Sequence, residues 1–252
     1  KMKAVNRRYG GGEVIRVTAK PAQAFPYKER AGRPDPYFTG RGLSDEIVQR
    51  FGLMVENGYA VLPVFVDGVC RSVCRRGIDP AVEPRYQNSR GAMPLWNSAA
   101  MERAAGKALF VTEGIFDALS LEELGFPAVA LCGAANTGKL VQKIDEYVPV
   151  AWPEKMILAG DSDAAGQGMN GKLREQLTAR GIACAVLALP EGCKDVNEAL
   201  VKNRDALQAA CEAAIAPQGV QQQPTLEDEF LAYLDRRGWA AVMSTGIAGL
   251  DK

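Results

Sequence analysis

The chain has 252 residues, 47% of them apolar, which is enough for one large or two small domains with ordinary buried cores. No run of about 18 apolar residues occurs, and residues 1–17 lack the apolar centre of a signal peptide, so we expect a cytoplasmic protein without a membrane-spanning helix. The net charge is zero, but it is unevenly distributed: residues 1–106 hold 17 Lys and Arg against 10 Asp and Glu, while residues 107–252 hold 13 against 20. This polarity is expected if the first half binds phosphates and the second gathers carboxylates around cations. A chance imbalance on solvent-exposed faces would explain it equally well.

The chain opens on residues 1–36, which are rich in Gly and Pro and show little periodicity. This pattern predicts a loosely structured opening segment. After it, Ser44 is placed to cap a short helix that runs to about Phe51 and buries Ile47.

Two extended runs follow, at 59–66 and 69–76. They are separated by Asp67-Gly68, a pair that favours the tight turn of a β-hairpin. We therefore expect residues 1–105 to form a small, basic α+β subdomain.

From Lys107 the pattern changes to an alternation of apolar strands and amphipathic helices. The strands are predicted at 108–112, 128–132, 156–160 and 183–189. The helices are predicted at 115–124, 137–147, 167–179 and 205–214. Such alternation predicts an α/β fold over residues 106–215, with a mostly parallel four-strand sheet flanked by helices and a ligand site beyond the carboxyl ends of the strands.

Residues 216–252 differ from the rest. A polar stretch with Pro and Gln at 216–224 predicts a linker. Thr225 then opens an amphipathic helix with acids in its first turn and Gly238 as its stop. Its apolar side suits packing on its own domain and docking on a neighbouring subunit equally well.

The six cysteines are scattered, and four lie in or beside apolar runs. This distribution suits small buried hydrophobic residues in a reducing compartment. Cys70 and Cys74 form a single C-x-x-x-C, but no second pair follows and the chain has no histidine, which argues against a structural zinc site.

Five acidic residues follow the predicted strands. Glu113 comes directly after the first strand, with Asp117 one helical turn beyond it; Asp161 and Asp163 follow the third strand, and Asp195 the fourth. Parallel strands bring such residues to one edge of the sheet. Charges so close do not all ionise without a cation, and hard oxygen ligands suit Mg²⁺ or Mn²⁺. A single acid at a strand end is more often a helix cap, but the group together predicts a divalent metal site.

Two motifs in this region resemble a known family. VTEGIFDAL, which contains Glu113, resembles the Glu-Gly motif of TOPRIM domains, and GDSDAAG, which contains Asp161 and Asp163, resembles their Asp-x-Asp motif. TOPRIM domains serve primases, topoisomerases, recombination proteins and nucleases, so the two motifs alone leave the function open. GRGLSDEIVQRFGL, PRYQNSRGAMPLWN and CKDVNEAL resemble stretches of bacterial and phage primases. Over about residues 37–215 the chain is thus similar to TOPRIM-type DNA primases, most of all to the primase half of phage primase-helicases.

The resemblance implies a TOPRIM fold and a DNA primase, a nucleotidyltransferase that makes short RNA primers on single-stranded DNA from ribonucleoside triphosphates in a bacterial host cell. It implies three catalytic acids, Glu113, Asp161 and Asp163, which hold Mg²⁺ or Mn²⁺ with Asp117 and Asp195 as further ligands. The residues expected to contact the nucleotide or the template are Arg75, Arg76, Arg85, Tyr86, Asn88 and Lys194. Trp96 is a further candidate for stacking on a base, or else is buried at the domain junction.

After the linker, STGIAGLD resembles the opening of the helicase core in bifunctional primase-helicases. The resemblance implies a helicase domain of the same parent chain as a partner, in a hexameric assembly. Three positions depart from the family pattern: Arg85 replaces a common lysine, Ser162 a common glycine, and Asn197 the usual second acid after Lys-Asp. None of these changes removes an essential carboxylate.

Other functions remain open. GAANTGK at 133–139 matches a phosphate-binding loop, but Leu140 stands where a magnesium-binding Ser or Thr is required, and an ATPase would leave Glu113 and Asp163 unexplained. A TOPRIM nuclease or topoisomerase-like domain would share the acids and cleave DNA. A third alternative is a non-catalytic DNA-binding module of a replicative helicase.

Overall fold

The computed structural model describes residues 34–89, 92–133, 136–146 and 153–216. The described residues up to Ile215 belong to one compact unit. The predicted opening segment before residue 34, nearly all of the predicted linker, the helix from Thr225 and the helicase-like tail lie outside the described residues. Within the described ranges, no helix has both the length and the apolar character needed to cross a membrane.

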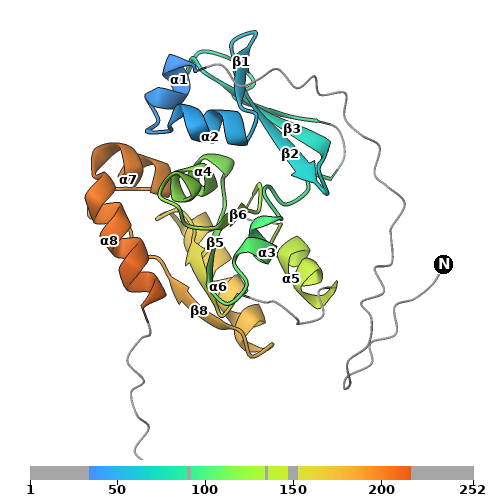
Figure 1. The fold of residues 1–252 in the computed structure, drawn as a ribbon, viewed down its shortest axis with the longest axis vertical. Helices are drawn as coiled ribbons and strands as arrows, with labels where there is room; N and C mark the ends of the chain where they lie inside the picture. The colour runs from blue at the N-terminus through green and yellow to red at the C-terminus, as the bar shows by residue number, and fades with distance from the viewer. Residues whose placement is uncertain (1–33, 90–91, 134–135, 147–152, 217–252) are drawn as a thin grey trace, which may run out of the picture. The chain divides into compact units, whose positions relative to one another are not determined.

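The amino-terminal part is an antiparallel sheet with two short helices (Figure 1). Its strand order is β1-β2-β3-β4. The elements are α1 (Pro36–Thr39), α2 (Asp45–Arg50), β1 (Met54–Glu56), β2 (Tyr59–Val66), β3 (Val69–Gly77) and β4 (Tyr86–Asn88). The predicted hairpin is confirmed: Asp67 and Gly68 have φ values of 51° and 72°, the positive values that a two-residue turn between twisted strands requires. Ser44 caps α2 as predicted, accepting a hydrogen bond from the N–H of Ile47.

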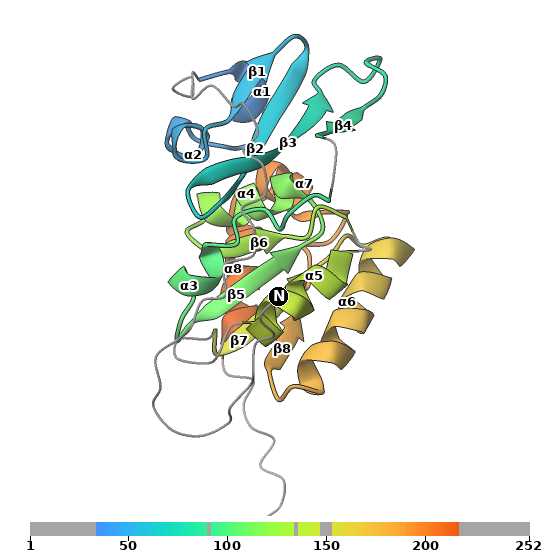
Figure 2. The same ribbon diagram turned by 90° about the vertical axis from the view of Figure 1, so that its right-hand side faces the viewer.

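The second part is the predicted parallel four-strand sheet, and the structure gives its strand order as β6-β5-β7-β8 (Figure 2). Its strands are β5 (Ala108–Thr112), β6 (Ala128–Ala130), β7 (Lys155–Ala159) and β8 (Ala183–Val186). Its helices are α3 (Ala100–Arg103), α4 (Ile115–Glu123), α5 (Thr137–Glu146), α6 (Ala164–Thr178), α7 (Val196–Lys202) and α8 (Arg204–Ile215).

Helices cover both faces of this sheet, because alternate side chains of each buried strand point to opposite sides. Leu109 and Val111 of β5 pack in the core with apolar residues of α3, α5 and α6. Ala108 and Phe110 pack in the core on the other face with apolar residues of α4, α7 and α8. The α/β fold class is therefore confirmed.

Helix α4 also joins the two sheets. Phe116 and Leu119 of α4 lie in the same buried cluster as Leu62 of β2 and Val48 of α2. Both views show α4 between the antiparallel and the parallel sheet (Figures 1 and 2). The antiparallel part thus rests on the helix that follows β5.

Short elements account for the differences from the predictions. β1, β4, α1 and α3, of three or four residues each, and α7, of seven residues, were not predicted. β8 ends at Val186, earlier than predicted, and α6 begins at Ala164 because Asp163 caps it.

Candidate active site

Two of the predicted catalytic acids lie at the ends of neighbouring strands. β5 and β7 are paired in parallel, with Thr112 opposite Ala159, so both strands end level with each other. Glu113 follows β5 at once, and Asp161 follows β7 after a single glycine. The structure therefore brings Glu113 and Asp161 to the same edge of the sheet.

The acids at this edge influence one another electrostatically. Burial, followed by the negative charges of Glu113, Asp195 and Asp163, raises the pKa of the Asp161 carboxyl to about 6. The positive charge of Lys194 offsets part of this increase. All five acids that were singled out interact around this edge, and we call Glu113, Asp117, Asp161, Asp163 and Asp195 the acidic edge.

Asp117 is the most deeply buried member of the acidic edge. Burial, then the charges of Asp195 and Asp161, raises the pKa of its carboxyl to about 7, although the N–H of Asn197 donates to Oδ1 at 3.1 Å and partly offsets the increase. A buried carboxylate among like charges costs free energy when it ionises. A cation at this edge would remove that cost.

Two of the acids also cap helices. Oδ1 of Asp163 accepts a hydrogen bond from the N–H of Gly166 at 2.9 Å, and Oδ1 of Asp195 accepts one from the N–H of Glu198 at 2.7 Å. These acids thus cap α6 and α7 as well as contributing to the charge cluster. In this arrangement, the described ranges contain no group of three Asp, Glu or Cys residues set to hold a metal ion directly.

A divalent cation nevertheless fits the chemistry of the acidic edge. The donors are hard carboxylate oxygens, the kind that Mg²⁺ and Mn²⁺ prefer. Burial, and then the charges of neighbouring carboxylates, raises the pKa of Asp117 and Asp161, so a cation would favour their ionised forms. The charges of Glu113, Asp195 and Asp163 all act on Asp161, and those of Asp195 and Asp161 act on Asp117, so these five carboxylates are the candidates to hold such an ion.

The turn that carries Asp161 is tightly built. A Cβ added to Gly166 would lie 2.2 Å from the carbonyl oxygen of Asp161 and 2.4 Å from its nitrogen, closer than any real Cβ contact. Oδ1 of the buried Asn170 accepts a hydrogen bond from the N–H of Gly160 at 3.1 Å. The N–H of Ser162 donates to the carbonyl of Lys194 at 2.8 Å, which joins this turn to the loop before α7.

The predicted nucleotide-binding residues divide between the faces of the antiparallel sheet. Arg76 lies opposite Tyr86, with its guanidinium 5.4 Å from that ring, and its Cζ is also 5.2 Å from the ring of Phe116 in α4. Because side chains alternate along a strand, Asn88, opposite Cys74, lies on the same face. We call this side, bearing Arg76, Tyr86 and Asn88, the basic face.

Arg75 is not on the basic face. It neighbours Arg76 in β3 and therefore points to the other side of the sheet, the side of Val61 and Val73. Arg85 is exposed just before β4. Lys194 is also exposed, and its positive charge offsets part of the increase in the pKa of Asp161. The structure thus brings Arg76, but not Arg75, together with the helix of Asp117.

One cationic residue at this site was missed by the sequence analysis. Arg41 stacks on the rings of Phe116 and Tyr37, with Cζ at 4.4 and 5.0 Å from the ring centres. Its Nη1 donates to Oδ1 of Asn197 at 2.7 Å, while the amide of Asn197 donates back to the carbonyl of Arg41. The motif GRGLSDEIV contained this arginine, but nothing in the sequence alone linked it to Asn197, 156 residues away.

Two other candidates have structural roles. Trp96 is 2% exposed and its Nε1 donates to the carbonyl of Pro63, so of its two predicted roles the structure shows burial at the junction. Lys139, the lysine of the loop-like motif, donates to the carbonyl of Met93 at 2.7 Å. Both side chains are used in holding the fold.

The comparisons with known proteins find similarity to Toprim-like proteins and to DNA primases. Residues 110–200 match the family model described as Toprim-like. The DNA primase of Myxococcus xanthus is 34% identical over 119 residues, which cover 43% of this chain and 19% of that protein. The DNA primase of Clostridium acetobutylicum is 24% identical over 227 residues, covering 71% of this chain and 37% of that protein. The chain therefore spans well under half of the length of either curated relative.

Among solved structures, the primase fragment of the bacteriophage T7 primase-helicase protein is similar with a TM-score of 0.59 and 25% identity. The similarity covers 78% of this chain and 81% of that one, so it extends beyond residues 106–215. Residues 110–200 therefore have the Toprim-like fold, and the chain is similar to DNA primases.

Proposed function

We propose that this chain is the catalytic core of a DNA primase, which joins ribonucleotides into short primers on a single-stranded DNA template in the cytoplasm of a bacterial host cell. One observation carries the proposal. Carboxylates from neighbouring strand ends interact at one edge of a Toprim-like sheet, and Arg76 and Arg41 meet the helix that begins there. A site of acids beside fixed guanidinium groups suits metal-dependent transfer of a nucleotide from a triphosphate.

In this proposal, each part of the site has its own task. Glu113, Asp161 and Asp163 hold Mg²⁺ or Mn²⁺, with Asp117 and Asp195 in support. The bound ion supplies a Lewis acid that neutralises the triphosphate and makes a 3′-hydroxyl more acidic. The arginines of the basic face and its surroundings, Arg41, Arg76 and Arg85, bind phosphate oxygens together with Lys194, because a guanidinium fork matches phosphate geometry.

The basic face also offers contacts for the template. Tyr86 is 52% exposed, so its ring is accessible for stacking on a base, which contributes about 1–3 kcal/mol per base in proteins that bind single strands. Asn88 is exposed on the same face. Arg75 lies on the far side of the sheet, so we assign it at most contacts with more distant phosphates.

The wider organisation is part of the same proposal. We infer a basic subdomain over residues 1–105, a catalytic Toprim-like domain over 106–215, and a connection over 216–252 to a helicase domain of the same parent chain in a hexamer. The similarity to the primase fragment of a phage primase-helicase supports this organisation.

The proposal is tested by incubating the chain with random single-stranded templates, labelled ribonucleotides and Mg²⁺. We expect short labelled products that depend on template and metal. A parallel incubation with supercoiled plasmid and Mg²⁺ checks for a DNA-cleaving Toprim-like enzyme. Cleavage without primer synthesis would replace the proposal with that alternative, and template binding without either activity would indicate a non-catalytic module.

The acidic edge also predicts how stability depends on pH. Asp161 and Asp117 have raised pKa values, about 6 and about 7 against a usual 3.8, so the folded state binds their protons more tightly than the unfolded state does. Their contribution to stability is therefore fully present below about pH 4 and is lost as the pH rises through 6 to 7. Mg²⁺ binds the ionised form, so we expect it to raise the melting temperature at pH 8 and have little effect at pH 5. An equal increase at both pH values, measured by thermal unfolding, would contradict a metal site at these acids.

A further inference from the structure

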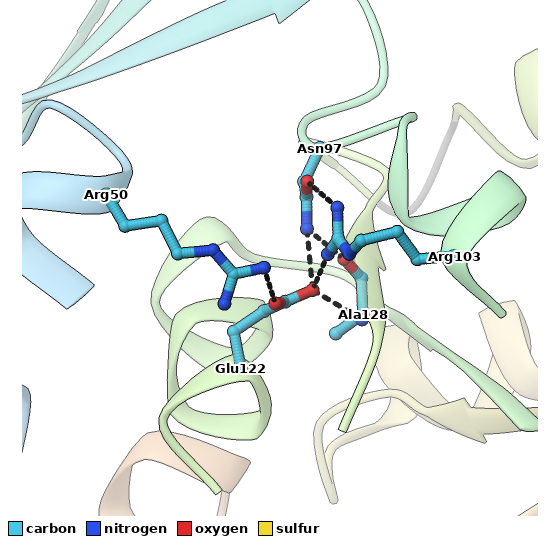
Figure 3. Close-up of polar contacts among 5 residues, drawn as sticks. All are labelled: Arg50, Asn97, Arg103, Glu122 and Ala128. Atoms are coloured by element: carbon cyan, nitrogen blue, oxygen red, sulfur yellow. Dashed lines mark hydrogen bonds and ion pairs between the residues drawn. The ribbon is translucent and has the colours of Figure 1, made fainter. Parts of the chain in front are cut away.

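Glu122 is a buried charged residue that does not belong to the acidic edge. Its side chain is 4% exposed and receives four polar contacts (Figure 3). Oε1 accepts hydrogen bonds from Arg103 Nη2 at 2.5 Å, Asn97 Nδ2 at 2.8 Å and the N–H of Ala128 at 3.0 Å, while Oε2 pairs with Arg50 Nη2 at 3.0 Å. A buried carboxylate satisfied so fully fixes the groups around it, because breaking any one contact leaves charge or a polar atom without its partner.

The four donors come from four separate segments. Arg50 is the last residue of α2, in the antiparallel part, and approaches from the side opposite Arg103 of α3 (Figure 3). Asn97 belongs to the loop before α3, and Ala128 begins β6. We call Glu122 with these four donors the Glu122 clamp.

The neighbouring residue strengthens the hold on α2. Oε2 of Glu123 accepts hydrogen bonds from the N–H and the hydroxyl of Ser44, the cap of α2, and its Oε1 pairs with Arg204 at the start of α8. Adjacent carboxylates at the end of α4 thus hold both ends of α2. The chain from α2 leads directly into the antiparallel sheet that bears the basic face.

The same helix carries the clamp and part of the acidic edge. Asp117 lies in the first turn of α4 and Glu122 in its last, a separation of about 7.5 Å along the helix axis. Helix α4 therefore contacts α2 through Glu122 at its carboxyl end and carries Asp117 of the acidic edge at its amino end. A change in the tilt of α2 moves the antiparallel sheet relative to Asp117.

We infer that Glu122 is a positioning residue: through Arg50 it sets the basic face at a fixed distance from the acidic edge, so that phosphate-binding and acidic groups meet the same nucleotide. This inference rests on the proposed function and deepens it. Glu122 does not reach the site itself. Its effect passes through Arg50 and α2, while its contact with Arg103 holds only α3 against the parallel sheet.

This asymmetry allows a matched test in the full chain. Arg50 and Arg103 pair with the same carboxylate and are similarly exposed, at 44% and 38%, so Arg50→Gln and Arg103→Gln remove comparable charge pairs. We expect Arg50→Gln to lower the kcat of primer synthesis about tenfold or more with little change in the KM for nucleotide, because a misplacement on the order of 1 Å far from the chemistry suffices for such a loss. Arg103→Gln should leave kcat nearly unchanged.

A conservative variant separates positioning from simple destabilisation. Arg50 meets Glu122 through a single nitrogen, so Arg50→Lys keeps that contact and should restore kcat to near the wild-type value. Hydrogen exchange of the amides in α2 and β3 provides a readout independent of activity. It should increase in Arg50→Gln, and not in Arg103→Gln or Arg50→Lys.

The outcomes distinguish this inference from the proposed function. If the wild-type chain makes no primers, the proposed function fails, and hydrogen exchange alone decides whether the clamp positions α2. If both arginine variants lose kcat equally, or neither does, Glu122 only stabilises the fold and the inference is overturned. Unchanged exchange in Arg50→Gln would overturn it as well.

Discussion

Replacing Asp161 with asparagine should reduce Mg²⁺-dependent primer synthesis by about a thousandfold or more, since an ion held beside the reacting phosphate contributes several kcal/mol to the transition state. The substitution keeps the shape of the side chain and removes its charge. Asp161 lies where four other acids interact, and its raised pKa shows that its ionised form is costly in the absence of a cation. The neutral variant should therefore fold at least as stably as the wild type at pH 8 without metal.

The expected combination, activity lost and stability kept or increased, is what separates a metal-binding acid from a structural one. The matched control is Asp145→Asn, which removes an exposed carboxylate paired with Arg180 on the surface and should leave primer synthesis unchanged. Thermal unfolding at pH 8 and initial rates with and without Mg²⁺ measure both quantities. An Asp161→Asn variant with wild-type rates would remove Asp161 from the catalytic set.

The parallel sheet was predictable because its strands are buried on both faces. Such strands appear in the sequence as short continuous apolar runs, as at 108–112 and 156–160, and both were placed within one residue. The position of Glu113 and Asp161 followed from that placement alone, because level parallel strands bring the residues after them together. The acidic edge was thus accessible from local patterns and topology.

The contacts that complete the site were not accessible in this way. Arg41 meets Asn197 across 156 residues, and Arg50 meets Glu122 across 72, so neither pair leaves a periodic pattern in the sequence. The difference between Arg75 and Arg76 needed the register of β3, since a shift of one residue would exchange their faces. Short elements such as β4 form because a neighbouring strand pairs with them, and not because of their own composition.

The contacts of Asn197 explain why this position holds an amide where the family pattern has an acid. Its amide donates to the carbonyl of Arg41 and to the hydroxyl of Ser120, and its Oδ1 accepts from Arg41. A carboxylate at this position would lack the two donors and would add a negative charge beside Asp117, whose pKa is already raised to about 7. Asparagine therefore lets one residue hold Arg41 without further charging the acidic edge.

Replacing Gly166 with alanine should have the second large effect, although it adds only one methyl group. The new Cβ would lie 2.2 Å from the carbonyl oxygen of Asp161, and this contact is with backbone, so either the turn at Asp161 or the first turn of α6 must move. We expect a loss of about 1–3 kcal/mol in the free energy of unfolding, typical of overpacking. Primer synthesis should fall about a hundredfold, because the displaced turn carries Asp161 and Asp163.

Gly168, two residues further along α6, is the matched control. A Cβ there meets no atom within 4 Å, so Gly168→Ala should stabilise the fold by about 0.5–1 kcal/mol, the usual gain from alanine in a helix, and leave activity unchanged. Denaturant unfolding and primer synthesis on both variants make the comparison. A loss of stability in Gly166→Ala together with a gain in Gly168→Ala could not come from helix propensity, which favours alanine at both positions. It would show that the close approach of Gly166 to the Asp161 backbone holds the acids in place. If Gly166→Ala were as stable and as active as Gly168→Ala, the turn at Asp161 would tolerate displacement. The tight turn would then have no part in positioning the acidic edge.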